Sequence, residues 1–231
     1  MHLGRTYGWL IAAIFATALV MGIALTGCGG GNGSGGLPSG RATIEQVNRG
    51  RYLVTSLGCS DCHNRGKDDP NDPNWLAGFI GQAGDQGEGA FQIGPFATYA
   101  TNLTPDAATG IGMHSDRQIF NALKYGLDPM ATPDVVITST TPGQGNFPAQ
   151  PHYLAPPMPW PSYRHLSDDD LWAIVAYLKH GIKPVKNNVP SSQGPPDFWA
   201  SAYTADKVGP WTLPAYPAAG EAFSPNGGGS G

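Results

Sequence analysis

Two cysteines and a histidine form the most specific chemical motif in the chain. Cys59 and Cys62 are three positions apart and His63 follows at once, in the order C-x-x-C-H. This spacing is typical of covalent attachment of a c-type haem. Two thiols on one helical turn can form thioethers with the two vinyl groups of a porphyrin, and the adjacent imidazole can bind the iron from the proximal side. The motif therefore predicts one covalently attached haem c.

Other uses of these three residues explain the sequence less well. A zinc site would need two further ligands in a second cluster, whereas the downstream histidines stand singly, at His114, His152, His165 and His180. A thioredoxin-type pair would need a βαβ context, but the flanking residues predict a helix followed by a Gly/Asp/Pro loop. A disulfide between Cys59 and Cys62 would leave His63 without a role.

The second axial ligand of such a haem separates electron transfer from ligand binding or catalysis. The candidates are an open site or one of five side chains, namely Met113, Met130, Met158, His152 and His165. Met158 lies in the sequence A-P-P-M-P-W, where prolines leave the backbone few conformations. They can hold a soft thioether against iron at low entropic cost. This favours Met158 as the distal ligand.

The N-terminus has the layout of an export signal. Residues 9–25 are almost entirely apolar and follow Arg5. The stretch ends in L-T-G-C at Cys28, which resembles the bacterial lipobox, where the leader is cut before a cysteine that receives lipid. The alternative is an uncleaved anchor, since the run is near the minimum of about 17 residues for spanning a bilayer. We expect a signal peptide at 1–27 and a lipidated Cys28 with a flexible linker at 28–42.

The predicted location of the protein follows from this leader. A di- or triacylated cysteine gives the two-chain anchoring that a single acyl chain cannot. We therefore expect an exported protein, lipid-anchored to the bacterial cell membrane or outer membrane and facing the periplasm.

The 13 basic and 17 acidic residues give a net charge of −4, which provides no basic stripe for nucleic acid.

The remainder of the chain predicts a mostly α fold with long loops. It has 33 Gly and 22 Pro, and Gly/Pro/Asn-rich stretches at 64–112 and 126–166. Such loops are unusual in an ordinary domain, but the apolar faces of a buried haem would supply a core for them to wrap. Strand signals are weak throughout.

Three helices are predicted, from Thr43 to Ser56, from Ser115 to Gly126 and from Ser167 to Gly181. The first two begin with a Ser or Thr followed three positions later by Gln, which is a capping box. The third begins with three aspartates, which a helix N-terminus favours without any metal ion. Its apolar positions repeat at i, i+3, i+4 and i+7, at Leu171, Ile174, Val175 and Leu178.

The order of three motifs resembles class I cytochrome c domains. They are C-S-D-C-H, N-L-T-P-D-A-A-T-G-I-G from Asn102, and M-P-W-P-S-Y-R-H-L-S-D-D-D-L-W from Met158. The resemblance is strongest to the cytochrome c subunits of membrane-bound alcohol, sorbitol and gluconate dehydrogenases and covers residues 43–190. It implies that Met158 is the distal haem ligand. Those subunits carry three C-x-x-C-H motifs, whereas this chain has one.

The resemblance implies three further features. A carbonyl of the loop at Gly94–Pro95 is expected to accept the proximal imidazole N–H of His63. The first and last helices are expected to cross at Gly50 against Tyr177. Donors to the haem propionates are expected at Trp160, Tyr163 and Arg164.

A Pro- and aromatic-rich tail follows at 191–231 and is too apolar for a solvated linker. We expect it to pack along the domain through its aromatic residues, which are Phe198, Trp199, Tyr203, Trp211 and Tyr216. A docking surface for a partner is the alternative.

These features predict a monohaem c-type cytochrome, an electron-transfer protein and not itself an enzyme. It would carry single electrons from a dehydrogenase donor to an oxidase or another cytochrome. One alternative is a five-coordinate haem enzyme or sensor, such as a peroxidase in which His152 acts on a bound oxidant. The single haem motif argues against it, because no second haem would deliver electrons. Another alternative is a fixed cytochrome subunit of a dehydrogenase complex.

Overall fold

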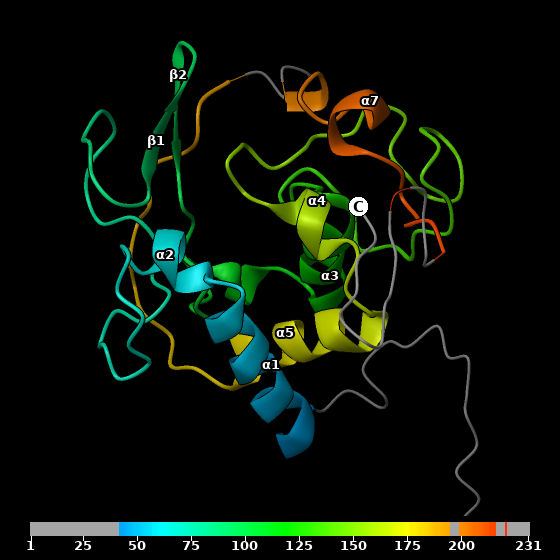
Figure 1. Ribbon diagram of the computed structural model, residues 1–231. Coiled ribbons are helices and arrows are strands. Elements are labelled where there is room, and N and C mark those ends of the chain that lie inside the picture. The colour runs from blue at the N-terminus through cyan, green and yellow to red at the C-terminus, as the bar shows by residue number, and fades with distance from the viewer. Residues whose placement is uncertain (1–41, 195–198, 216–219, 221–231) are drawn as a thin grey trace, which may run out of the picture. The chain divides into compact units, whose positions relative to one another are not determined.

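The structure is a computed structural model that describes residues 42–194, 199–215 and 220 (Figure 1). The predicted signal peptide at 1–27, Cys28 and the linker up to residue 41 lie outside the described residues, as do Phe198 and Tyr216 of the tail. Within the described ranges, no helix is both long enough and apolar enough to cross a membrane.

The three predicted helices are present, as α1 (Ile44–Ser56), α3 (Asp116–Tyr125) and α5 (Asp168–His180). Thr43 and Ser115 each complete a capping box with the Gln three positions on. The Ser167 hydroxyl accepts from the amide of Asp170 at 3.1 Å. These bonds satisfy amides that a helix leaves free at its N-terminus. The prediction of a helix-rich fold with few strands is confirmed.

The structure also contains shorter elements that were not predicted as helices or strands. They are the helices α2 (Cys59–His63), α4 (Trp160–Tyr163) and α7 (Ala205–Val208), the 3₁₀ helix η2 (Ile111–Met113), and the strands β1 (Ala90–Ile93) and β2 (Phe96–Tyr99). The two strands pair antiparallel, with Ala90 opposite Tyr99 and Ile93 opposite Phe96. Each strand has only four residues, the shortest run that signals a strand, and the two residues between them, Gly94 and Pro95, are not among the usual two-residue hairpin turns, so this hairpin was not predicted.

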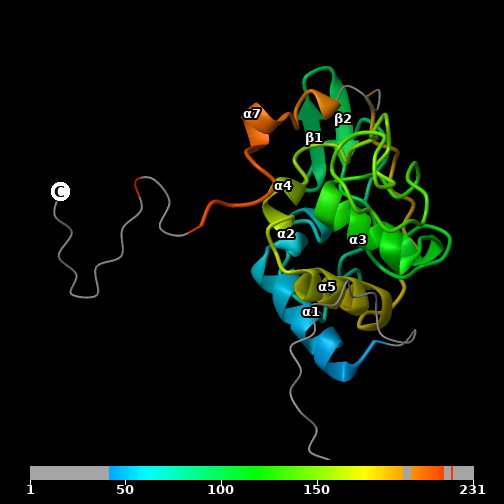
Figure 2. The same ribbon diagram turned by 90° about the vertical axis from the view of Figure 1, so that its right-hand side faces the viewer.

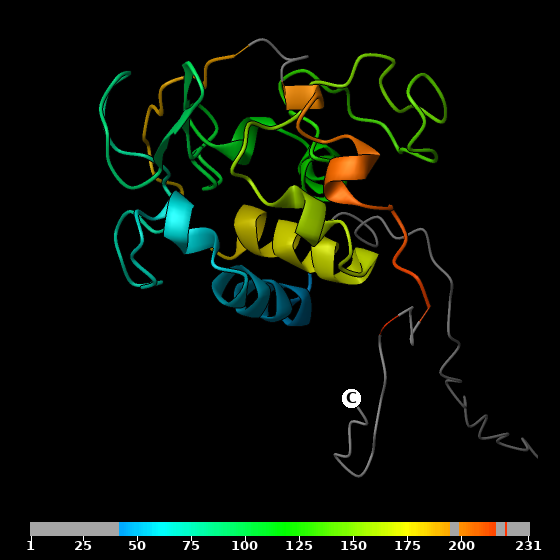
Figure 3. The same ribbon diagram turned by 45° about the horizontal axis from the view of Figure 1, so that its top comes forward.

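Helix α5 is the centre of the core. All eight of its residues from Leu171 to Leu178 are buried, which is more than the single apolar face that the sequence predicted. The reason is that α5 has neighbours on opposite sides, with α1 on one side and α3 on the other (Figures 2 and 3). Trp172 stacks on Phe120 of α3, with the ring centroids 4.4 Å apart.

The crossing of α1 and α5 depends on Gly50. A Cβ added to Gly50 would lie 1.9 Å from the carbonyl oxygen of Ala173 and 2.7 Å from the Cβ of Tyr177. The expected contact of Gly50 with Tyr177 is therefore confirmed. Beside the crossing, the Arg49 guanidinium lies 2.8 Å from the Asp170 carboxylate, so α1 and α5 are also joined by an ion pair.

Replacement of Gly50 by Ala tests this crossing. Alanine is the better helix former by about 1 kcal/mol, but here its methyl group would overlap a backbone carbonyl that cannot rotate away. We expect a net loss of about 1 to 3 kcal/mol in the free energy of unfolding, the usual cost of overpacking, measured by chemical denaturation. The control is Asn48→Ala, at an exposed position of α1, which should not destabilise. An unchanged midpoint for Gly50→Ala would show that the helices do not cross at this residue.

Candidate haem site

The C-x-x-C-H motif forms a single helical turn, α2, set at an angle to α1 (Figure 1). Helix α1 ends at Ser56 and is capped by Leu57, and Gly58 follows in the left-handed conformation, with φ of 68°. Side chains disfavour this conformation, and a Cβ here would also lie 2.7 Å from the Asp61 carboxylate. Gly58 therefore lets the chain turn directly from α1 into α2 and leaves little freedom in where the motif points.

His63 is buried and held by one directed hydrogen bond. Its side chain is 8% exposed, and its Nδ1 lies 2.7 Å from the carbonyl oxygen of Thr101. A carbonyl only accepts, so Nδ1 carries the proton and the lone pair is on Nε2. Burial lowers the pKa of His63, while the bond to Thr101 acts in the opposite direction. The result is a neutral imidazole with Nε2 in the form that binds a metal.

The expectation for Gly94–Pro95 is wrong. These two residues form the turn between β1 and β2, and the carbonyl that meets His63 belongs to Thr101. Thr101 immediately precedes the N-L-T-P-D motif, whose Asn102 is buried and donates to the Val185 carbonyl at 2.8 Å. This motif therefore fixes the backbone that presents the Thr101 carbonyl. The position of Thr101 directly before the motif was the signal in the sequence that could have identified this carbonyl.

Cys59 and Cys62 are free thiols. Burial raises the pKa of Cys59 to about 11 and also raises the pKa of Cys62. A redox-active C-x-x-C pair works in the opposite way, because its attacking thiol is activated by a lowered pKa. Across the residues that the structure describes, no three His, Cys, Asp or Glu side chains gather into a metal-binding cluster.

The donor set therefore fits a c-type haem. It offers two thiols in their protonated form and one neutral imidazole, all on a single turn of helix. Cys59 packs against the main hydrophobic core, which includes Leu171 and Trp172 of α5. Met158 packs against the same core.

The other candidate ligands have different surroundings. Of the three methionines in the described ranges, Met113 is 49% exposed and Met130 is 73% exposed, whereas Met158 is partly buried. His165 is exposed and His152 is partly buried. Met158 is thus the methionine that shares a hydrophobic core with the motif.

Arg164 has a different role from the one expected. It is 4% exposed, and its Nη2 donates to the carbonyls of Val208, Gly209 and Pro210 at 2.6, 3.2 and 2.9 Å. These three bonds hold the tail and engage Arg164, so we do not assign it to a haem propionate. The Tyr163 hydroxyl donates to the Leu57 carbonyl at 3.3 Å.

The tail packs on the domain over its described part, as expected. Trp199 is 4% exposed, and its ring lies 6.1 Å from that of Phe96 in β2. Further along, the rings of Tyr203 and Trp211 lie 4.9 and 5.9 Å from that of Trp160.

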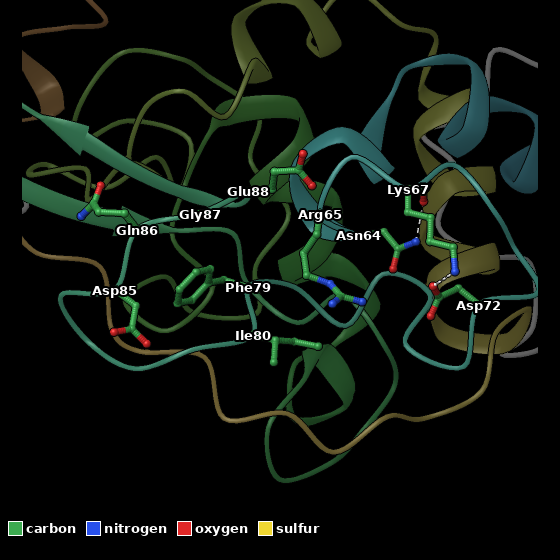
Figure 4. Close-up of a pocket in the computed structure, with 10 residues that line it drawn as sticks. All are labelled: Asn64, Arg65, Lys67, Asp72, Phe79, Ile80, Asp85, Gln86, Gly87 and Glu88. Atoms are coloured by element: carbon green, nitrogen blue, oxygen red, sulfur yellow. Dashed lines mark hydrogen bonds and ion pairs between the residues drawn. The ribbon is translucent and has the colours of Figure 1, made fainter.

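A cavity of about 610 Å³ lies beside the segment that follows His63 (Figure 4). Asn64, Arg65 and Lys67 line one side, and Glu88 lies near Arg65. Lys67 forms an ion pair with Asp72 at 2.5 Å. The rest of the lining is mainly polar and charged, and Phe79 and Ile80 are its two large apolar side chains, which is little apolar surface for the faces of a porphyrin.

Comparison with known proteins points to c-type cytochromes. No family model matches the chain. It is 28% identical to the fructose dehydrogenase cytochrome subunit of Gluconobacter japonicus over 169 residues, which are 73% of this chain and 27% of that protein. It is 29% identical to the gluconate 2-dehydrogenase cytochrome c subunit of Pantoea cypripedii over 178 residues, 74% of this chain and 33% of that protein.

A third relative is the cytochrome c subunit of the quinone alcohol dehydrogenase of Gluconobacter oxydans. It is 29% identical over 153 residues, 64% of this chain and 24% of that protein. The chain thus spans about a quarter to a third of the length of the curated relatives it matches. The predicted resemblance to cytochrome c subunits of dehydrogenases is confirmed.

The two thiols differ enough in burial to be told apart in haem-free polypeptide. The thiolate is the reactive form, and Cys59 is more buried than Cys62 and has a pKa of about 11. We expect an alkylating reagent at pH 8 to modify Cys62 several times faster than Cys59, measured by mass spectrometry of the separated peptides. The variant Cys62→Ser should leave a slowly reacting Cys59. Equal rates at the two positions would contradict this placement of α2.

Proposed function

We propose that the chain is a monohaem c-type cytochrome that transfers single electrons and does not itself act on an organic substrate. The observation that carries this proposal is the buried, neutral His63 on the C-x-x-C-H turn, with Nδ1 bound to the Thr101 carbonyl. The similarity to cytochrome subunits supports electron transfer and does not favour the five-coordinate, peroxidase-like alternative.

Four residues would hold the haem. Cys59 and Cys62 would form the thioethers, His63 would be the proximal ligand and Met158 the distal one. The haem supplies an iron that changes oxidation state by one electron. The protein's part is to keep the His63 ring neutral and oriented, and to offer the Met158 thioether from a proline-restricted loop. With His63 and Met158 both bound to the iron, no position on it would be left for a substrate, and Met/His ligation together with burial would raise the reduction potential.

The partners follow from the relatives and from the leader. The relatives are named as subunits of fructose, gluconate and quinone alcohol dehydrogenases. We propose a membrane-bound dehydrogenase as the electron donor, with this chain either as a carrier or as a fixed subunit, and an oxidase or another cytochrome as the acceptor. A signal peptide at 1–27 would direct export of the chain. A lipidated Cys28 with a linker at 28–42 would then hold the cytochrome domain, residues 43–190 followed by the tail at 191–231, at a membrane surface facing the periplasm. Confinement raises the effective concentration of partners without any new contact.

Covalent attachment is tested by extraction. In protein purified from a host that matures c-type cytochromes, the haem should stay with the polypeptide through denaturation and acid-acetone treatment, with one haem per chain. The double variant Cys59→Ser, Cys62→Ser should lose haem to the solvent under the same treatment. Extraction of haem from the unmodified protein would refute covalent attachment.

Ligation by Met158 is tested by replacement with Ala. The weak red-region sulfur-to-iron charge-transfer band should disappear, the reduction potential should fall, and the ferrous protein should bind carbon monoxide. The matched controls are Met113→Ala and Met130→Ala, which remove exposed methionines and should leave all three properties unchanged. Loss of the band in one of these controls, with retention in Met158→Ala, would move the ligand to that position.

Lipidation of Cys28 is tested by localisation. The variant Cys28→Ser should appear in the soluble fraction or retain an uncleaved leader, since it cannot carry two acyl chains. The unmodified protein should sediment with membranes. Mass spectrometry that finds an unmodified Cys28 thiol on an intact leader would contradict this part of the proposal.

A further inference from the structure

The loop that carries Met158, residues 154–159, is held largely by other parts of the chain. Three of its six residues are prolines, which have no N–H with which to bond. The amide of Leu154 donates to the Gly126 carbonyl at 2.7 Å, and the amide of Met158 donates to the Ala155 carbonyl at a longer 3.3 Å. Much of the order of this loop must therefore come from contacts with other segments.

Two aromatic rings close the base of the loop. Tyr153 precedes the loop and Trp160 follows it, and their rings stack with centroids 5.6 Å apart and planes within 2° of parallel. Trp160 is fully buried against Gly126, where an added Cβ would lie 2.2 Å from the indole ring. The stack therefore joins both ends of the loop at the C-terminal end of α3.

Tyr203 of the tail contacts both of these rings and the loop itself. Its ring lies 4.9 Å from that of Trp160 and 5.4 Å from that of Tyr153. Its hydroxyl donates to the Leu154 carbonyl at 3.2 Å. From another direction, the Thr98 hydroxyl of β2 donates to the Pro156 carbonyl at 3.1 Å. Two side chains distant in sequence thus bond to carbonyls of the loop, and one of them belongs to the tail.

The tail is itself fixed on either side of Tyr203. Before it, Trp199 is buried and meets Phe96 of β2. After it, Arg164 bonds to three successive tail carbonyls, and its guanidinium carbon lies 4.9 Å from the centroid of the Trp211 ring. Figures 1 and 3 show α7, drawn in orange, beside α4. The described tail residues 199–211 therefore reach from the hairpin to the end of α4 and contact the Met158 loop between these points.

We propose that residues 199–211 form a strap that positions Met158 as the distal ligand, with Tyr203 as its positioning residue. This inference rests on the proposed function, in which Met158 binds the haem iron. Tyr203 does not touch the haem in this proposal. It acts through the Leu154 carbonyl and through the stack of Tyr153 on Trp160, so its removal should free the loop and let a competing ligand displace the thioether more easily.

The test uses the purified, haem-loaded protein with the variant Tyr203→Phe, which keeps the ring and removes the hydroxyl. Imidazole is titrated into the oxidised protein, and loss of the red-region charge-transfer band reports displacement of Met158. We expect imidazole to bind about fivefold more tightly than to the unmodified protein, the factor that corresponds to the loss of one hydrogen bond. Amide hydrogen exchange in the peptide that contains Leu154 to Trp160 should become faster.

The matched control is Tyr125→Phe. The Tyr125 hydroxyl also donates to a backbone carbonyl, that of Ile137 at 3.4 Å, but in a different loop. This variant should lose a hydrogen bond without any change in imidazole affinity. A second test variant, Arg164→Lys, keeps the charge but not the planar donor fork, and it should raise imidazole affinity by releasing the tail.

The outcomes distinguish the strap from the ligand assignment. If the unmodified protein shows the band, and imidazole binds Tyr203→Phe and Arg164→Lys no more tightly than it binds the unmodified protein, the strap is overturned and ligation by Met158 stands. If the unmodified protein lacks the band, ligation by Met158 is overturned and the strap with it. Tighter binding in Tyr203→Phe alone or in both test variants, together with no change in Tyr125→Phe, supports the strap.

Discussion

The close approach of α1 to α5 at Gly50 is the contact on which the rest of the domain depends. It requires a residue without a side chain, because the carbonyl of Ala173 occupies the place of a Cβ. The direction of α1 then determines where Gly58 turns the chain into α2, and so where the C-x-x-C-H motif points. Helix α5 also packs on α3. Gly126 caps the C-terminal end of α3, and the ring of Trp160 lies against Gly126. The positions of the C-x-x-C-H motif and of the base of the Met158 loop therefore both depend on the buried helix α5.

The long loops are ordered by side chains that bond to distant backbone. Asn187, which follows α5, donates to the carbonyls of Ala77 and Phe79 at 2.7 and 2.8 Å. Asn102 and Thr104 are buried and both donate to the Val185 carbonyl. A buried carbonyl without a partner is costly, so each of these bonds disfavours other arrangements of the loop. A chain rich in Gly and Pro can in this way have defined loops without regular secondary structure.

Burial sets the protonation states at the candidate haem site. It favours the neutral forms of both the thiols and the imidazole, and the pKa values of Cys59 and His63 move accordingly, upward for the thiol and downward for the ring. The imidazole is thus in its metal-binding form, while the thiols are not poised as redox nucleophiles. The tail is bonded to the domain through Tyr203, which donates to the Leu154 carbonyl, and through Arg164, so it is better described as part of the domain than as an appendage to it.

The sequence alone determined the features that depend on near neighbours. Thr43 with Gln46 and Ser115 with Gln118 specify helix starts within a single turn, and C-x-x-C-H carries its chemistry in five consecutive residues. The tertiary structure decided the rest, because the partners are far apart along the chain. His63 meets the Thr101 carbonyl across 38 positions, and Arg164 meets the tail carbonyls across 44 to 46. A backbone carbonyl is present in every residue, so no residue type marks the one that a buried ring or guanidinium will find, and only the folded path of the chain selects it.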